Sequence, residues 1–303
     1  MLMLRLIKRN ILVYIRDRSN VFFSLLSMLI IIGLMVVFLG KMNADSVVNL
    51  LNQYGGQRDT ALDRTNAQQL VMMWTLAGIV VVNSITITLS MVGIMVEDEA
   101  QKRLSSFYVT PVNRGIFILS YILAAIIMGI IMCSLTVILG AAYIGLSGGM
   151  ILSAEAMGLT FLYIILNVFA SASMVFLIAN FVHSQSAFAG ASTIIGTLAG
   201  FLAAIYLPMG MLPERVQTVL KCFPLLYGSS LMREVFTKQL LKETFLNCPD
   251  ELISSYKEYM GITLLYNGEG VSDTLQVAIL VISGIIFIGI AAALQRKRNV
   301  MSR

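Results

Sequence analysis

The sequence predicts an all-α polytopic membrane protein with six transmembrane helices, and three observations support this fold class. The chain of 303 residues is 58% hydrophobic and only 12% charged, about half the charged fraction of a typical soluble domain. Six apolar segments each reach about 20 residues, the length that a helix needs to cross the hydrocarbon core. The centres of these segments hold almost no charge, and backbone groups in lipid must be satisfied within their own segment, which favours helices over open strands.

The six predicted spans form a single transmembrane domain over residues 1–303. They lie at residues 21–40, 70–96, 115–139, 157–182, 187–207 and 274–294. The distribution of lysine and arginine predicts how they are oriented. Basic residues gather before the first span, after the second span and at the C-terminus, namely Arg5, Lys8, Arg9, Arg16, Arg18, Lys102, Arg103, Arg114, Arg296, Lys297, Arg298 and Arg303. Six spans place all three groups on one side, which the positive-inside rule makes cytoplasmic.

We therefore expect a multi-pass protein of the cell membrane, bacterial in origin, with both termini in the cytoplasm. The net charge of +5 is explained by these topology signals beside the lipid bilayer, so it does not indicate a nucleic-acid partner. Residues 1–19 place basic and apolar side chains on opposite sides, which predicts an interfacial amphipathic helix. Trp74, at the outer end of the second span, is interpreted as an interfacial anchor.

Residues 208–273 predict an extracellular helical segment before the last span. Pro213 can begin a short helix, and a second amphipathic helix is expected over residues 225–242. The apolar faces of these helices predict that the segment packs on the outer surface of the bundle. Cys222 and Cys248 both fall in this segment, and the sequence leaves open whether they form a disulfide.

The loop at residues 97–114 is the most informative stretch outside the spans. Three acidic residues, Glu97, Asp98 and Glu99, end the second span, and two basic residues follow. An apolar-aromatic patch that includes Phe107 and Tyr108 then precedes Pro111. The pattern fits a short amphipathic helix on the cytoplasmic side whose aromatic side chains enter a pocket on a soluble partner. From the residues alone, an equally good interpretation is that the charges merely end one span and Pro111 breaks the next helix.

This loop resembles the coupling region of permeases in the type-2 ABC export family. Those proteins carry an acidic cluster, a short helix and then a Ser/Thr-Pro-Val/Ile-x-Arg sequence, which Thr110-Pro111-Val112-Asn113-Arg114 matches here. Many members have a glycine where this chain has Ala100-Gln101-Lys102. The resemblance extends to Arg9-Asn10 and Tyr14-Ile15-Arg16-Asp17-Arg18 before the first span. It also covers the stretch at residues 206–213, Pro224 and Arg233.

The resemblance implies a half-transporter that pairs with a second permease copy or a paralogue and docks two ABC ATPase subunits. It implies that Glu97, Asp98, Glu99, Phe107, Tyr108 and Pro111 transmit force from the ATPase. It also implies that the second and fifth spans flank a central path, which makes Asn83 and Thr86 candidate substrate-path residues. Polar residues within spans more often serve helix packing, so that alternative stays open for both. ATP and Mg would be bound by the partner ATPase, with no cofactor in this chain.

The fifth span contains a ridge of small residues, Gly196, Gly200 and Ala204, that predicts close packing with another helix within or between protomers. No phosphate-binding loop of the Gly-x-x-x-x-Gly-Lys-Ser/Thr type, zinc-protease motif or Gly-x-Ser-x-Gly motif occurs in the sequence. Leu146-Ser147-Gly148-Gly149 matches the start of an ATPase signature, but we interpret it as a turn. We therefore expect no enzyme activity and no metal site in this chain.

The function expected from the sequence is that of a permease subunit of an ABC exporter. It would move an amphipathic drug, antimicrobial peptide or lipid-linked compound outward, as in efflux and multidrug or antibiotic resistance. The alternative is a membrane assembly or sensor protein that does not transport. A stoichiometric ATPase subunit should copurify with the first and not with the second.

Overall fold

The computed structural model describes residues 2–19, 21–22, 26, 29, 33, 40–54, 59–103, 114–146, 148–150, 152–182, 184–266 and 268–301. Within these ranges, five helices are long and apolar enough to cross a membrane. They confirm the second to sixth predicted spans. Most of the first predicted span, at residues 21–40, lies outside the described residues. The helical architecture confirms the all-α membrane class. A short antiparallel hairpin of two-residue strands, β1 (Leu265–Tyr266) and β2 (Glu269–Gly270), is also present.

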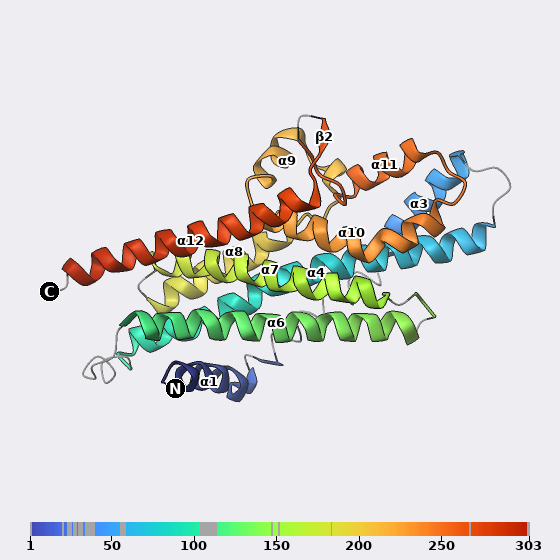
Figure 1. Ribbon diagram of the computed structural model, residues 1–303. Coiled ribbons are helices and arrows are strands. Elements are labelled where there is room, and N and C mark those ends of the chain that lie inside the picture. Colours follow the sequence, from blue (N-terminus) through green and yellow to red (C-terminus); the bar gives the residue numbers. More distant parts are fainter. Residues whose placement is uncertain are drawn as a thin grey trace.

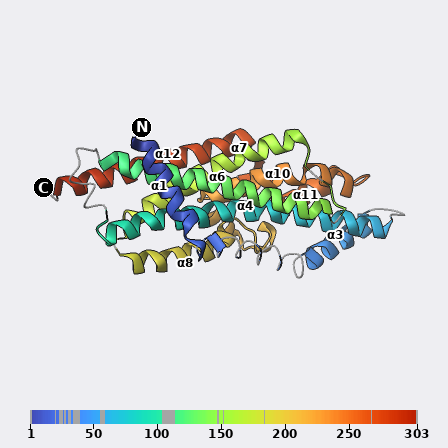
Figure 2. The same ribbon diagram turned by 90° about the horizontal axis from the view of Figure 1, so that it is seen from below.

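The central helix is α4 (Thr60–Ala100), which has 41 residues. The side chain of Asp59 accepts the backbone N–H groups of Ala61 and Leu62 and so caps its N-terminus. Helices α6 (Arg114–Leu146), α7 (Ala154–Ala179) and α8 (Gln185–Leu202) pack directly against α4. Figure 1 and Figure 2 show α4 running beside α6 through the middle of the bundle. This placement explains why almost every residue from Leu70 to Val96 is buried.

The last helix, α12 (Asp273–Met301), packs on α7 at the edge of the bundle. Its outer face exposes isoleucines, including Ile282, Ile285 and Ile286. A helix face of this kind is stable in contact with lipid chains. Both termini lie at one end of the bundle, and α3 (Gly40–Tyr54) and α11 (Asp250–Tyr259) lie at the other end (Figure 1).

Helix α1 (Leu2–Arg16) lies across α6 and also contacts α4 (Figure 2). Ile7 and Tyr14 face the bundle and are buried, whereas Leu4 is 71% and Ile15 is 51% exposed. The predicted apolar face therefore divides into an inner line that packs on protein and an outer line that is available to lipid. This division agrees with a helix lying along the headgroups.

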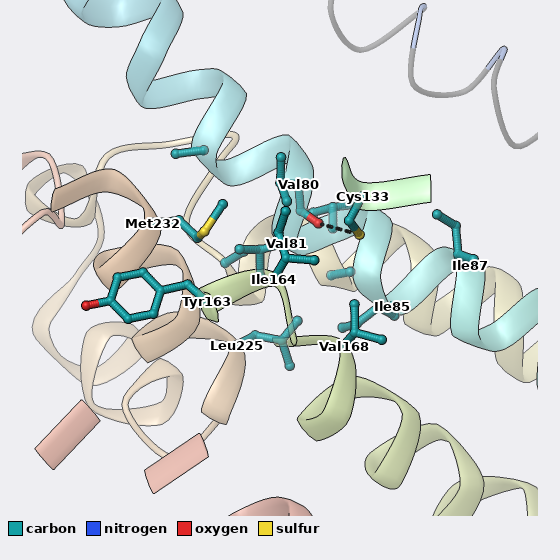
Figure 3. Close-up of a cluster of buried hydrophobic side chains, with 14 of the residues drawn as sticks. Val80, Val81, Ile85, Ile87, Cys133, Tyr163, Ile164, Val168, Leu225 and Met232 are labelled. Atoms are coloured by element: carbon teal, nitrogen blue, oxygen red, sulfur yellow. Dashed lines mark hydrogen bonds between the residues drawn. The ribbon is translucent and has the colours of Figure 1, made fainter. Parts of the chain in front are cut away.

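The segment before α12 contains η2 (Met209–Met211), α9 (Glu214–Leu220), α10 (Pro224–Thr244) and α11. Helix α9 begins directly after Pro213, as predicted, and α10 begins at Pro224, one residue before the expected start. The expectation that α10 packs on the outer surface of the bundle is wrong. Its first ten residues are all buried, and it contacts α4, α7 and α12. Figure 3 shows Leu225 and Met232 of α10 among Val81, Ile85, Ile164 and Val168 of α4 and α7.

A glycine allows α10 to lie this close to α7. A Cβ atom added at Gly228 would overlap the side-chain oxygen of Asn167, and the two following residues, Ser229 and Ser230, are also small and fully buried. Small residues of this kind let two helix backbones approach closely. The amphipathic pattern predicted a helix here, but these short side chains place it inside the bundle.

Candidate functional site

Four charged or polar side chains meet where α4 leaves the bundle, and we call this group the Asp98 cluster. Arg9 of α1 donates one hydrogen bond of 2.6 Å to Asp98 and another of 2.8 Å to the Tyr121 hydroxyl of α6. The Tyr121 hydroxyl donates to the same Asp98 oxygen at 2.7 Å. Arg103 donates to the other oxygen at 3.3 Å. The Asp98 cluster therefore joins α1, α4 and α6 at one point.

Asn10, next to Arg9, strengthens the same junction. Its amide donates to the Ser120 hydroxyl of α6 at 3.3 Å, and its side-chain oxygen accepts from Arg9 at 3.0 Å. Asn10 is only 1% exposed, and buried polar groups of this kind are costly unless they are hydrogen-bonded. Arg9-Asn10, one of the pairs that carry the family resemblance, thus has a structural role: it docks α1 on α6.

An ion pair and hydrogen bonds hold the members of the Asp98 cluster together. The Asp98 side chain is 1% exposed and that of Arg9 is 33% exposed. Burial by itself lowers the pKa of Arg9, but the hydrogen bonds and charges of Asp98 and Tyr121 together outweigh it, so the pKa is raised. Arg9 is thus always charged. Removing it would leave a buried carboxylate without its closest counter-charge, which costs on the order of 3 kcal/mol.

The structure separates the three acidic residues predicted to contact the ATPase. Asp98 faces inward and is used within the bundle, whereas Glu99 is exposed. Glu97 is 37% exposed and accepts a hydrogen bond of 2.9 Å from Gln101. Phe107, Tyr108 and Pro111 lie outside the described residues. Only Glu97 and Glu99 of the acidic group are therefore accessible to a partner.

A pattern in the sequence could have identified Asp98 as the buried member. Met91, Met95 and Asp98 follow one another at helical spacing, and the two methionines are buried. Asp98 thus continues the inner stripe of α4 for one more turn. Its partners Arg9 and Tyr121 are 89 and 23 residues away in sequence, and no local pattern reveals them.

Two residues after the end of α4, Lys102 has a left-handed backbone conformation with φ of 56°. The backbone N–H of Arg103 returns to the carbonyl of Asp98 at 2.9 Å, and that of Lys102 bonds Glu99 at 3.1 Å. This is the arrangement that usually places glycine after a helix, because glycine has no Cβ to oppose the left-handed conformation. It gives a physical reason for the glycine of many family members in this stretch.

A groove of about 320 Å³ lies between α4 and α8. Its lining mixes apolar and hydroxyl side chains without any charge: Thr86, Leu89, Ser90, Gly93, Phe188, Ser192, Thr193 and Gly196. Among the residues that the structure describes, the buried hydroxyl of Ser192 has no hydrogen-bond partner. The groove can therefore receive a neutral group that is partly apolar and offers a hydrogen bond.

The two candidate path residues occupy different positions. Thr86 lines the groove. The Asn83 amide instead donates to Thr136 of α6 at 2.9 Å and is 4% exposed. Asn83 thus takes part in helix packing, the alternative that the sequence left open. Sequence reasoning did not single out the α8 side of the groove, Phe188, Ser192 and Thr193.

The predicted small-residue ridge does not continue to Ala204. Helix α8 ends at Leu202, and Ala204 has a left-handed φ of 50°. Gly196 faces the groove, with no atom within 4 Å of an added Cβ. Gly200 is covered by the ring of Tyr206, so its close contact is made by the chain immediately after the helix. Only Gly196 remains open to another helix.

At the other end of α4, the fully buried Arg233 of α10 binds the ends of two helices. Its guanidinium donates to the carbonyls of Ala203 and Ala204, after α8, at 3.0 and 2.8 Å. It also donates to Gly261, after α11, at 3.3 Å. A cation at helix C-termini is favoured by the helix dipole. Burial lowers the pKa of Arg233 to about 9, so the group is charged at neutral pH.

Trp74 is a member of this arrangement, and its assignment as an interfacial anchor is wrong. It is 1% exposed, and its indole N–H donates to the carbonyl of Met260 at 2.8 Å. A buried indole needs a hydrogen-bond acceptor, and here the C-terminus of α11 supplies one. Trp74 therefore ties α4 to the segment before α12.

Cys222 and Cys248 are both free in the structure, so the disulfide that the sequence left open is not formed there. Cys222 is exposed at the end of α9, with its thiol 3.6 Å from the Thr218 carbonyl. Cys248 is half-buried against the main core. Ser147 of the turn expected at residues 146–149 lies outside the described residues, but Gly148 has a left-handed φ of 77° and its backbone N–H bonds the carbonyl of Gly145 at 3.1 Å, as in a turn.

Comparison with known proteins agrees with this architecture. The sequence model of the ABC-2 type transporter family matches residues 1–237. That range includes the Asp98 cluster, the groove and Arg233. No individual curated protein matches the chain. The family match covers more than three quarters of the sequence, so this chain belongs to the ABC-2 type transporter family and is a membrane-embedded permease subunit of an ABC transporter.

Proposed function

We propose that this subunit works in an exporter, pairs with a second permease copy or paralogue, and receives force from ABC ATPase subunits through its cytoplasmic end. The observation that carries the proposal is the Asp98 cluster. It locks α1, α4 and α6 together at the start of the loop that resembles the family's coupling region. A push on that loop would therefore move three helices as one body.

The acidic residues have separate roles in this proposal. Glu97 and Glu99 lie at the accessible edge and contact the ATPase directly. Asp98 is a positioning residue. It accepts hydrogen bonds from Arg9, Arg103 and Tyr121, and these bonds hold the end of α4 that carries Glu97 and Glu99 in place. Force that reaches α4 is carried along a helix whose central residues are almost all buried.

The groove between α4 and α8 is the substrate path in this proposal, and it would face the second permease. Helix α8 is largely exposed in the single chain, which leaves a face for another subunit. The uncharged lining of hydroxyl and apolar groups favours an amphipathic substrate such as a drug, an antimicrobial peptide or a lipid-linked compound. The substrate passes outward as the paired bundles expose the groove to one side and then to the other.

The coupling role is tested in vesicles that contain the complete transporter with its ATPase. We expect Glu97→Ala with Glu99→Ala to lower export strongly while the complex still assembles in the membrane. The matched control is Glu251→Ala with Glu258→Ala, two exposed acids on α11 at the opposite end. Export unchanged by the Glu97 and Glu99 substitutions would reject the coupling role. Failure of any ABC ATPase to copurify would instead favour a non-transporting assembly or sensor protein.

A further inference from the structure

A second pocket lies at the outer ends of α7 and α12, away from the α4–α8 groove. It has a volume of about 350 Å³ and is bounded by the first turns of α7, one face of α10 and the start of α12. This volume is within the range of small-ligand sites. Its floor contains Tyr163, Phe236 and Leu240, all of which are buried. The pocket thus combines an apolar floor with a polar entrance.

The entrance carries charges of both signs. Lys238 and Lys242 come from α10, Glu155 from α7 and Asp273 from the start of α12. None of these four exposed side chains makes an ion pair or hydrogen bond with another described side chain. The fifth charge, Glu234, is paired outside the pocket with Lys257 at 3.2 Å. Two positive and two negative groups therefore remain for a ligand.

The two lysines of the entrance belong to α10, and the two carboxylates that remain belong to α7 and α12. Lys238 and Lys242 are four residues apart on α10, so they lie on the same face of that helix. A phosphate is favoured on this side. Glu155 and Asp273 favour an ammonium group.

The pocket continues into a surface suited to acyl chains. Leu159 lines the pocket and is 39% exposed, and Leu162, three residues further along α7, is 47% exposed. Both are exposed on α7, which is a candidate transmembrane helix, so lipid chains can reach them. A ligand with a charged headgroup in the pocket can therefore lay a hydrocarbon chain along α7. A free phosphate compound has no group for this surface.

The geometry points to a binding site for one zwitterionic phospholipid whose headgroup carries a phosphate and a primary ammonium. The phosphate lies beside Lys238 and Lys242, the ammonium lies beside Glu155 and Asp273, and an acyl chain follows Leu159 and Leu162. The bound lipid fills the gap between α7, α10 and α12. This site is separate from the proposed substrate path and does not depend on transport.

The test uses the full chain in detergent with equal amounts of phosphatidylethanolamine and phosphatidylglycerol, and native mass spectrometry measures the lipid that is retained. We expect about fivefold more phosphatidylethanolamine than phosphatidylglycerol on the unmodified chain. Lys238→Gln with Lys242→Gln should remove that preference. Glu155→Gln with Asp273→Asn should shift it towards phosphatidylglycerol, because two positive groups then remain.

The control is Arg215→Gln on α9 with Lys221→Gln directly after it, both outside the pocket, which should retain the lipids as the unmodified chain does. Equal retention of the two lipids on the unmodified chain would overturn the assignment. So would a preference that both sets of pocket substitutions leave unchanged. Displacement of the lipid by an equal concentration of glycerophosphoethanolamine would show that the acyl chain contributes nothing, and would overturn the lipid as ligand.

Discussion

The guanidinium carbon of Arg233 lies 4.2 Å from the centre of the Trp74 ring. Both side chains are fully buried, and both direct hydrogen bonds at the carbonyl of Met260, Arg233 at 3.5 Å and Trp74 at 2.8 Å. A desolvated cation over an indole face is attracted by about 2 kcal/mol. The contact between these two side chains joins α4 to α10, and their hydrogen bonds join both helices to the ends of α8 and α11.

Replacement of Arg233 by lysine should destabilise the protein by about 3 kcal/mol. Lysine keeps the charge, but its single ammonium cannot reach the carbonyls of two helix ends that a planar fork binds at once. Trp74→Phe keeps an aromatic face but removes the indole N–H and part of the buried ring, so about 1–3 kcal/mol is expected. Thermal unfolding of the purified variants measures both. A lysine variant as stable as the unmodified protein would contradict the assigned role of the guanidinium.

Neutralising Asp98 should destabilise the junction of α1, α4 and α6 more than losing both members of its ion pair. Asp98→Asn leaves Arg9 without its carboxylate, at a cost of on the order of 3 kcal/mol. Adding Arg9→Gln removes the unpaired charge and should restore part of the loss, with a coupling energy of about 1–3 kcal/mol between the two sites. Denaturant unfolding of the single and double variants gives this coupling. Additive effects would show that the two residues do not interact.

Lys102→Gly should stabilise the end of α4 by about 1 kcal/mol, because it relieves the left-handed conformation of a residue with a Cβ. Lys102→Val should destabilise it, since a β-branched residue fits that conformation worse. Thermal unfolding distinguishes the two variants. The idea fails if glycine and valine shift the melting temperature in the same direction.

Gly228→Ala should destabilise the protein by about 1–3 kcal/mol, because the added methyl group would overlap Asn167 and push α10 away from α7. The control is Gly289→Ala in α12, where an added Cβ meets no atom within 4 Å. That change should be neutral or slightly stabilising, because alanine is the better helix former. Asn167→Ala in the Gly228→Ala background should recover part of the loss. Equal melting temperatures for the two single variants would refute the close contact.

Gly196→Leu should block transport while leaving the fold intact. The groove side of Gly196 is open, so the leucine fills space between α4 and α8 that the proposed substrate needs. Export in vesicles should fall at least about tenfold, which corresponds to about 1.4 kcal/mol. The matched control is Gly158→Leu on the exposed face of α7, where an added Cβ also meets nothing. Full export by the Gly196 variant would exclude the groove as the path.

The membrane-spanning helices could be predicted because length and composition alone decide whether a segment can cross a bilayer. The second to sixth predicted spans correspond to α4, α6, α7, α8 and α12. The helix start after Pro213 was also predictable, because proline restricts the backbone locally. These features depend on neighbouring residues only.

Features that depend on distant residues were missed or only partly predicted. The acceptor of Trp74 is 186 residues away, and nothing near Trp74 reveals that α11 ends beside it. Likewise, the left-handed turn at Ala204 stops α8 where Arg233 binds its carbonyls, and the run of small residues gave no sign of that stop. The burial of α10 depended on the fit of Gly228 to Asn167. The acidic group was recognised as a site, but the separate position of Asp98 depends on α1 and α6.

Helix α4 joins two fixed points at a wide separation. At 1.5 Å per residue its 41 residues extend about 60 Å, twice the thickness of the hydrocarbon core. Arg233 and Trp74 anchor one part of it, and Asp98 anchors another about 36 Å away. A rod of this length that pivots by about 10° about its middle moves its two tips by about 5 Å in opposite directions. Such a tilt would narrow one end of the groove beside α4 while widening the other, with no change in the shape of the helix itself.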